Sequence, residues 1–168
     1  MRRLRFAALA ALAMTLGACG TSGLNFVQDE RIEITAPGDR AKVSLPVTIS
    51  WEVRDFEITG PDGSSRPDAG YFGVYVDRAP QPPQKTQAWL TRDEQNCLGG
   101  CSSELALASR DIHSTEETRF TIDRLARPSR QAQRRREFHE VTIVLLDGRG
   151  RRIGESAFIA QFEVDRNP

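Results

Sequence analysis

Cysteine is the residue type with the most evident chemistry in this chain, and its three copies fall into two groups. Cys19 ends the stretch Leu16-Gly17-Ala18-Cys19, whereas Cys97 and Cys101 lie together in the stretch NCLGGC. A thiolate is the strong nucleophile among side chains, and small neighbours leave Cys19 open to a modifying enzyme. The spacing therefore points to covalent modification near the N-terminus and to a local pair further along the chain.

Residues 1–18 have the composition of an export signal. Three arginines occur among the first five residues, and residues 6–18 carry no charged side chain. This run is shorter than the roughly 20 residues that a membrane-spanning helix needs, and it lacks the polar face of an amphipathic helix. It has the length of the apolar core of a secretory signal, followed by small residues at the cleavage position. We predict a cleaved signal peptide over 1–18 and a short polar tether over 19–30.

The stretch that ends at Cys19 resembles the lipobox of bacterial lipoproteins: a branched apolar residue, two small residues and a cysteine. The resemblance covers about the first twenty residues. It implies that Cys19 accepts a diacylglyceryl group and becomes the first residue of the mature chain, which the membrane then holds by lipid. Because two or more acyl chains anchor a protein stably, no span is needed. Gly20 stands where an aspartate would signal inner-membrane retention, which implies the outer membrane or the outer face of the cytoplasmic membrane.

Cys97 and Cys101 are expected to form a disulfide, because an exported chain meets an oxidising compartment. The two glycines between them let the chain turn tightly enough to bring the sulfur atoms together. A redox-active pair usually has two intervening residues near a helix start, and a metal site needs further ligands. Both remain alternatives to the structural disulfide.

His113 and His139 are the only histidines, and each has a carboxylate neighbour, Asp111 and Glu140 respectively. Such pairs can exchange protons near neutral pH. However, no nucleophile motif accompanies them, and adjacent residues of a strand point to opposite faces. We expect both histidines at the surface or at strand ends, with no catalytic residue, cofactor or metal ligand.

Six arginines lie between residues 124 and 136, in the stretch RLARPSRQAQRRREF. A solvated loop is one interpretation. The other is an anion-binding patch of Arg130, Arg134, Arg135 and Arg136, which would meet lipid head groups or acidic envelope polymers. From Cys19 onward the chain keeps 20 of its 23 basic side chains against 23 acidic ones, which is not the profile of a nucleic-acid-binding domain.

Alternating apolar residues predict strands along the rest of the chain, with Val47, Ile49, Trp51 and Val53 as one clear example. Turn residues separate the segments, and no long helical pattern follows the signal peptide. The expected strands are residues 31–35, 45–53, 71–77, 104–112, 118–123, 138–147 and 156–164. Together they predict an all-β fold, a single antiparallel β-sandwich of about seven strands over residues 31–165.

This strand order is similar to that of an immunoglobulin-like or fibronectin type III-like domain. The similarity rests on Trp51 in the second strand, the stretch FTIDRL in the fifth, and a final hairpin, HEVTIVLLDGRGRRIGES. It implies that Trp51 anchors the core and that Leu125 closes the bottom of the sandwich. The chain lacks the inter-sheet cysteine pair of antibody domains, and its middle section, 78–103, is longer.

The loops 60–70 and 79–84 are candidate recognition loops, because loops at the ends of a sandwich commonly carry binding residues. Tyr71, Tyr75 and Trp89 near them could stack on sugars or peptides, although we expect core packing or ordinary exposure. We therefore predict a membrane-anchored envelope lipoprotein that acts as a non-catalytic binding or structural module for an envelope protein or polymer. A small envelope enzyme or redox or metal accessory protein is an alternative, as is a ligand-binding or sensor subunit of an envelope complex.

Overall fold

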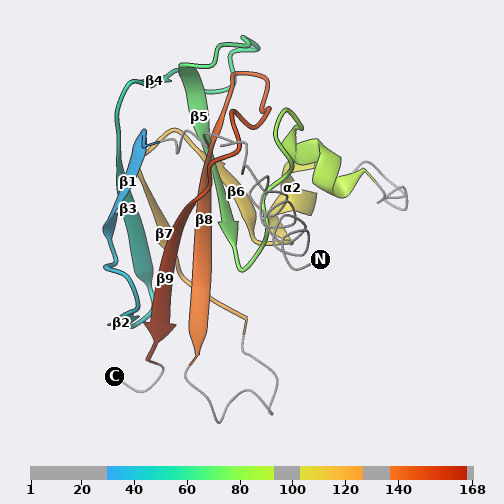
Figure 1. Ribbon diagram of the computed structural model, residues 1–168. Coiled ribbons are helices and arrows are strands. Elements are labelled where there is room, and N and C mark those ends of the chain that lie inside the picture. Colours follow the sequence, from blue (N-terminus) through green and yellow to red (C-terminus); the bar gives the residue numbers. More distant parts are fainter. Residues whose placement is uncertain (1–29, 93–102, 127–136, 166–168) are drawn as a thin grey trace, which may run out of the picture.

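Two β-sheets packed against each other form the body of the protein (Figure 1). The computed structural model describes residues 30–92, 103–126 and 137–165. The strands are β1 (Ile32–Ala36), β2 (Ala41–Val43), β3 (Val47–Val53), β4 (Glu57–Ile58), β5 (Ala69–Val76), β6 (Ile112–Thr115), β7 (Arg119–Ile122), β8 (Phe138–Leu146) and β9 (Phe158–Val164). One sheet has the order β1-β3-β7, and the other has six strands in the order β2-β9-β8-β5-β4, with β6 also paired to β5. The fold is mostly β, as the sequence predicts.

The prediction of a purely antiparallel sandwich is wrong at two places. Strand β2 pairs with β9 in parallel, and the two-residue strand β4 pairs with β5 in parallel. The first case arises because the chain leaves the three-stranded sheet after Ala36, turns through a bond from Ala41 N to Gly38 O, and continues along the opposite sheet. One N-terminal segment thereby contributes to both sheets, and the described residues hold nine strands rather than about seven.

The main core lies between the sheets and follows the predicted alternation. On β3, Val47, Ile49 and Trp51 are buried at 5, 0 and 2% exposure, and the Trp51 ring meets Phe72 of β5 edge to face at 5.3 Å. This confirms Trp51 as a core anchor. Leu125 is half-buried and packs against the same core, as the sequence predicts. Burial of such apolar surface supplies most of the driving force for folding.

The six-stranded sheet is covered on its outer face as well. Every residue of β5 is buried, and Tyr71 and Tyr75 belong to a second apolar cluster on that face. The short 3-10 helix η1 (Gln87–Thr91) and the helix α2 (Ser103–Ala108) supply Leu90 and Leu107 to this cluster. The two tyrosines are therefore packing residues, as expected, and an extra layer lies on one side of the sandwich.

The prediction of a strand over residues 104–112 is wrong in its first part. Residues Ser103–Ala108 form helix α2, and only Ile112 onward is a strand. The alternation of leucine and alanine imitated a strand, but Glu, Leu and Ala all have high helix propensity. In the helix Leu107 packs inward while Leu105 is 70% exposed, and the chain turns at Asp111, where φ is +58°, to enter β6.

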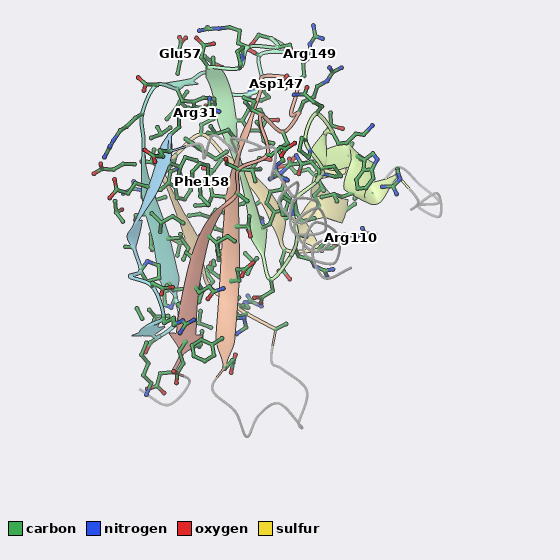
Figure 2. The ribbon with its side chains drawn as sticks, viewed as in Figure 1. Arg31, Glu57, Arg110, Asp147, Arg149 and Phe158 are labelled. Carbon is green, nitrogen blue, oxygen red and sulfur yellow. The ribbon has the colours of Figure 1, made fainter. Side chains whose placement is uncertain are left out.

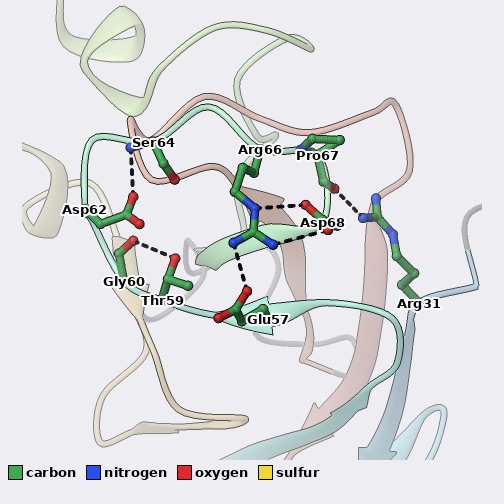
Figure 3. A network of polar contacts seen from close by, with 9 residues as sticks. All are labelled: Arg31, Glu57, Thr59, Gly60, Asp62, Ser64, Arg66, Pro67 and Asp68. Atoms are coloured by element: carbon green, nitrogen blue, oxygen red, sulfur yellow. Dashed lines mark hydrogen bonds and ion pairs between the residues drawn. The ribbon is translucent and has the colours of Figure 1, made fainter.

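A network of charged side chains closes the end of the sandwich where β4 meets β5 (Figure 3). Arg66 donates to Glu57 at 2.8 Å and to Asp68 at 3.3 Å. Arg31, just before β1, donates to the carbonyl of Pro67 at 2.7 Å, which ties the loop to the three-stranded sheet. Of the two candidate recognition loops, 60–70 is thus held in place by its own charged side chains.

The same loop is docked on the turn between β8 and β9, where Figure 2 labels Asp147 and Arg149. Asp147 is 5% exposed; it accepts bonds from the N–H groups of Arg149 and Arg151 at 2.9 and 2.8 Å and from Ser65 Oγ at 3.0 Å. A Cβ on Gly148 would clash with the Asp62 carboxylate, so the close approach of loop and turn requires glycine there. These contacts make the loop part of the scaffold.

Candidate functional site

The sandwich is hollowed along one side, where β6 is an outer strand of the six-stranded sheet and β7 an outer strand of the three-stranded sheet. Two adjacent cavities of about 850 and 310 Å³ lie there and share His113 and Phe120. All four residues of β6 line the larger cavity, together with residues of α2. We call the two cavities together the edge groove. The larger cavity has the size of ordinary ligand sites.

The rings of His113 and Phe120 form the partition between the two cavities, with centroids 4.9 Å apart. They come from opposite sheets, because β6 pairs with β5 and β7 pairs with β3. Burial lowers the pKa of His113, with Asp111 acting in the opposite direction. The imidazole is therefore neutral at pH 7, and the partition presents two aromatic rings rather than a cation.

Acidic side chains surround the edge groove. Glu104 of α2, with Glu116 and Glu117 of the β6–β7 turn, lines the larger cavity, and Asp111 and Asp123 line the smaller one. The only basic residue among the lining residues of these two cavities is Arg124. Glu117 forms an exposed ion pair with Arg119 at 3.1 Å. The groove thus carries a net negative charge, which attracts a basic partner.

A buried polar network supports the floor of the larger cavity. Gln87 of η1 is 7% exposed; it donates to the carbonyl of His113 at 3.2 Å and accepts a bond from Ser114 Oγ at 2.7 Å. It fixes η1 to β6 through residues that lie 26 positions apart in the sequence. Satisfied buried networks of this kind hold one arrangement of the elements that they join.

The network continues beneath the proline-rich loop. Tyr75 donates its hydroxyl to the fully buried Gln81, and burial raises the pKa of Tyr75 to about 12, against the effect of hydrogen bonds with Gln87 and Gln81. Arg152, 7% exposed, donates to the carbonyls of Gln81 and Glu155 at 2.9 and 2.6 Å. Burial lowers the pKa of this guanidinium. The second candidate recognition loop, 79–84, is therefore anchored from below by a buried arginine.

A separate cluster surrounds His139 at the start of β8. Its Nδ1 lies 2.6 Å from Asp77 Oδ2, and its Nε2 lies 2.9 Å from Glu137 Oε1. Hydrogen bonding to Asp77 raises the pKa of His139; burial opposes this, and Glu137 reinforces it. With a carboxylate oxygen beside each nitrogen, the protonated ring donates to both and joins the end of β5 to the start of β8.

His139 lies at a strand end, one of the two positions expected for it, and it is 7% exposed. Glu140 does not pair with the ring, as expected for adjacent residues of a strand. Glu140 bonds Gln161 at 3.0 Å, and the partners of the ring are Asp77, 62 residues away, and Glu137, two residues away.

The residues that the sequence singled out as sites lie outside the described part of the chain. These are the lipidation site Cys19, the cysteine pair Cys97 and Cys101, and the patch of Arg130, Arg134, Arg135 and Arg136. All of them stay predictions. Among the residues that the structure does describe, no group of three or more His, Cys, Asp or Glu side chains is placed to hold a metal ion. No helix in residues 30–92, 103–126 and 137–165 is long and apolar enough to cross a membrane.

Comparison with known proteins found no match to this chain among protein-family models, curated proteins or solved structures. The arrangement of the residues therefore carries the functional argument alone.

Sequence reasoning missed the edge groove. Its acidic residues come from α2, from the turn between α2 and β6, from the β6–β7 turn and from the residues that follow β7, and the predicted strand over 104–112 left no place for α2. The pair of glutamates at 116 and 117, in a turn between two short strands, was the one signal available. This pair of glutamates points to an acidic groove only when β6 and β7 are known to lie in different sheets.

Proposed function

We propose that this protein is a lipid-anchored, non-catalytic binding module of the bacterial cell envelope, and that its edge groove binds a basic partner. The lipid anchor follows from the lipobox-like stretch before Cys19 and from the export signal. The observation that carries the binding role is the lining of the groove, with five acidic residues against one arginine around two aromatic rings.

We also propose that the domain is an immunoglobulin-like or fibronectin type III-like variant. In such sandwiches the first, second and fifth strands share one sheet, and the third, sixth and seventh share the other. The orders β1-β3-β7 and β9-β8-β5 support this assignment when β2 is counted as a continuation of the first strand and the two-residue strand β4 is left out of the count. The additional layer of η1 and α2 between β5 and β6 distinguishes this chain. Binding modules are a common use of this architecture, but the argument for binding rests on the groove.

A basic partner is favoured because the groove's carboxylates remain available to it. Within the described residues, Glu104, Glu116, Asp111 and Asp123 form no ion pair. A cationic side chain that enters the groove would meet these carboxylates, and such contacts between opposite charges favour a basic partner.

The test is the affinity of the full chain, purified in non-ionic detergent, for a fluorescent hexalysine peptide at low salt. Replacement of Glu104, Glu116 and Glu117 by glutamine should weaken binding at least about tenfold, which corresponds to about 1.4 kcal/mol. The matched control replaces Glu30, Glu33 and Glu52, which are exposed and lie outside the groove, and changes the net charge equally. If both triple variants lose the same affinity, the attraction is a property of net charge and the groove is not the site.

A further inference from the structure

We propose that the basic partner of the edge groove is an extended peptide that binds as an added strand along the outer edge of β6. The inference rests on the proposed function, since it assigns a form to the partner of the same groove. It follows from the hydrogen-bond register of β5 and β6, from the layers that flank this edge, and from the charges at its two ends.

The register shows which backbone groups of β6 are already used. Asp77 N donates to Glu140 O at 2.8 Å, and Val76 N donates to Asp111 O at 3.0 Å. Odd-numbered residues of β5 therefore bond to β8, and even-numbered ones bond to β6. With Val74 opposite His113 and Phe72 opposite Thr115, the backbone groups of His113 and Thr115 face β5.

The backbone N–H and C=O groups of Ile112 and Ser114 consequently face away from β5. These groups point outward from the edge of the sheet, where both residues line the larger cavity. Among the strands of residues 30–92, 103–126 and 137–165, β6 pairs with β5 alone. An unpaired strand edge is a template for a further strand, and main-chain bonds of this kind supply affinity in many peptide-binding domains. Two outward-facing residues offer up to four such bonds.

The two faces that flank this edge carry different kinds of side chain, which suits the alternating side chains of an added strand. On one side lie the aromatic rings of His113 and Phe120, and on the other lie Glu104 and Leu107 of α2. Successive side chains of an added strand point to these two sides in turn. A sequence that alternates apolar and basic residues places its apolar side chains against the rings and its cations beside the acidic residues.

Charge at the ends of β6 argues against a second copy of this chain as the added strand. Asp111 precedes β6, and Glu116 and Glu117 follow it. Two β6 strands paired edge to edge in antiparallel orientation would bring Asp111 of one copy near the glutamates of the other, and like charges placed opposite each other destabilise such pairs. A basic peptide reverses the sign of the same interaction.

The first part of the experiment compares two fluorescent octapeptides with the full chain in non-ionic detergent. One alternates valine and lysine (VKVKVKVK), and the other has the same composition in two blocks (KKKKVVVV). We expect the alternating peptide to bind at least about tenfold more tightly. Equal affinity for both, lost in the Glu104, Glu116 and Glu117 triple variant, overturns strand addition and leaves the proposed function standing. Failure of both peptides to bind overturns the inference and the proposed function together.

The second part removes one backbone donor. The change Ser114→Pro eliminates an N–H group that faces the groove. It leaves every backbone hydrogen bond between β5 and β6 in place, and proline is tolerated at such edge positions. We expect it to reduce affinity for the alternating peptide at least about tenfold relative to Ser114→Ala, which keeps the backbone N–H and loses only the hydroxyl bond to Gln87. Thr121→Pro makes the equivalent change on the outer edge of β7, where Thr121 lines the smaller cavity, and should weaken binding less than Ser114→Pro does. Loss of binding in Thr121→Pro but not in Ser114→Pro overturns the assignment to β6.

A third measurement reads the pairing directly and does not depend on variants that fold. Hydrogen exchange should slow at least about tenfold at the amides of Ile112 and Ser114 when the alternating peptide is bound, with little change at His113 and Thr115. Uniform slowing or no slowing at these four amides overturns strand addition. So does a dimer of the peptide-free chain in sedimentation that shows the same protection, because the edge would then belong to a second copy.

Discussion

Replacing His139 by glutamine should destabilise the protein most strongly near pH 5 and progressively less toward pH 9. The imidazolium donates to Asp77 at 2.6 Å and to Glu137 at 2.9 Å, and each charge-assisted bond is worth about 1.5–3 kcal/mol. Asp77 is 43% exposed and keeps its 2.9 Å bond from Glu140 N–H, so water replaces part of what it loses. Glu137 is 15% exposed and loses more. We therefore expect a loss of about 2–4 kcal/mol near pH 5.

The sign of the pH dependence follows from the directions of the two pKa shifts. The folded-state pKa of His139 is raised above 6.5, so its stabilising effect is fully present below about pH 6.5 and is lost as the pH rises through the folded value. Burial acts most strongly and raises the pKa of Asp77, but the hydrogen bonds from His139 and from the Glu140 N–H, together with the charge of His139, outweigh it, and the net pKa is lowered below 3.8. The contribution of Asp77 is therefore lost only when the pH falls toward and below that value. The His139–Asp77 ion pair therefore stabilises the fold most between the lowered pKa of Asp77 and the raised pKa of His139.

The assay is urea unfolding followed by tryptophan fluorescence at five pH values from 5 to 9. The matched control is His113→Gln, the only other histidine in the chain. Burial lowers the pKa of His113, so its contribution is present above about pH 6.5 and is lost as the pH falls. The loss of unfolding free energy relative to the parent should therefore decrease with rising pH in His139→Gln and increase with rising pH in His113→Gln. An equal loss of stability at pH 5 and pH 9 in His139→Gln, or an NMR titration of His139 below 6.5, refutes the reasoning.

Four further outcomes are expected. Asp147→Ala should cost about 2–4 kcal/mol in urea unfolding, because a 5% exposed carboxylate that accepts three hydrogen bonds is lost, whereas alanine at the exposed Asp62 should cost much less. Cys19→Ala should abolish acyl labelling in cells, and continued labelling would contradict the lipobox assignment. A thiol count on freshly exported protein should find Cys97 and Cys101 without free thiols before reduction and with two after it. Changing Arg134, Arg135 and Arg136 together to glutamine should weaken binding to anionic vesicles at low salt, and unchanged binding would favour a plain solvated loop.

The inner layer of the fold was predictable because its signal is local. Strict alternation along β3 predicted that Ile49 and Trp51 share one face, and both are at most 2% exposed. Register and hairpin geometry follow from such patterns with little help from the rest of the chain. The strand segments were therefore found, even where their pairing was not.

The outer layer was not predictable, because its signals depend on partners far along the chain. In β5, burial on both faces hides the alternation that a half-buried strand shows, so Tyr71 and Tyr75 gave no sign of a covering layer. A segment with the composition of α2 satisfies either a strand or a helix pattern, and packing of Leu107 on the second cluster decides between them. The Asp77–His139 contact spans 62 residues and has no local signature. Long-range polar pairs of this kind require the fold to be known first.

The covering layer also explains why the groove lies where it does. A sandwich that buries both faces of β5 must cover Tyr71 and Tyr75, and the chain does so with η1 and α2. Because β6 follows α2 after a turn of three residues, it enters the sheet at the end of this layer and becomes its outer strand. The next strand, β7, crosses to the other sheet, so two strand edges and the end of the covering layer meet along one side. The outward-facing backbone groups of β6 are thereby left facing a cavity that is lined by acidic side chains.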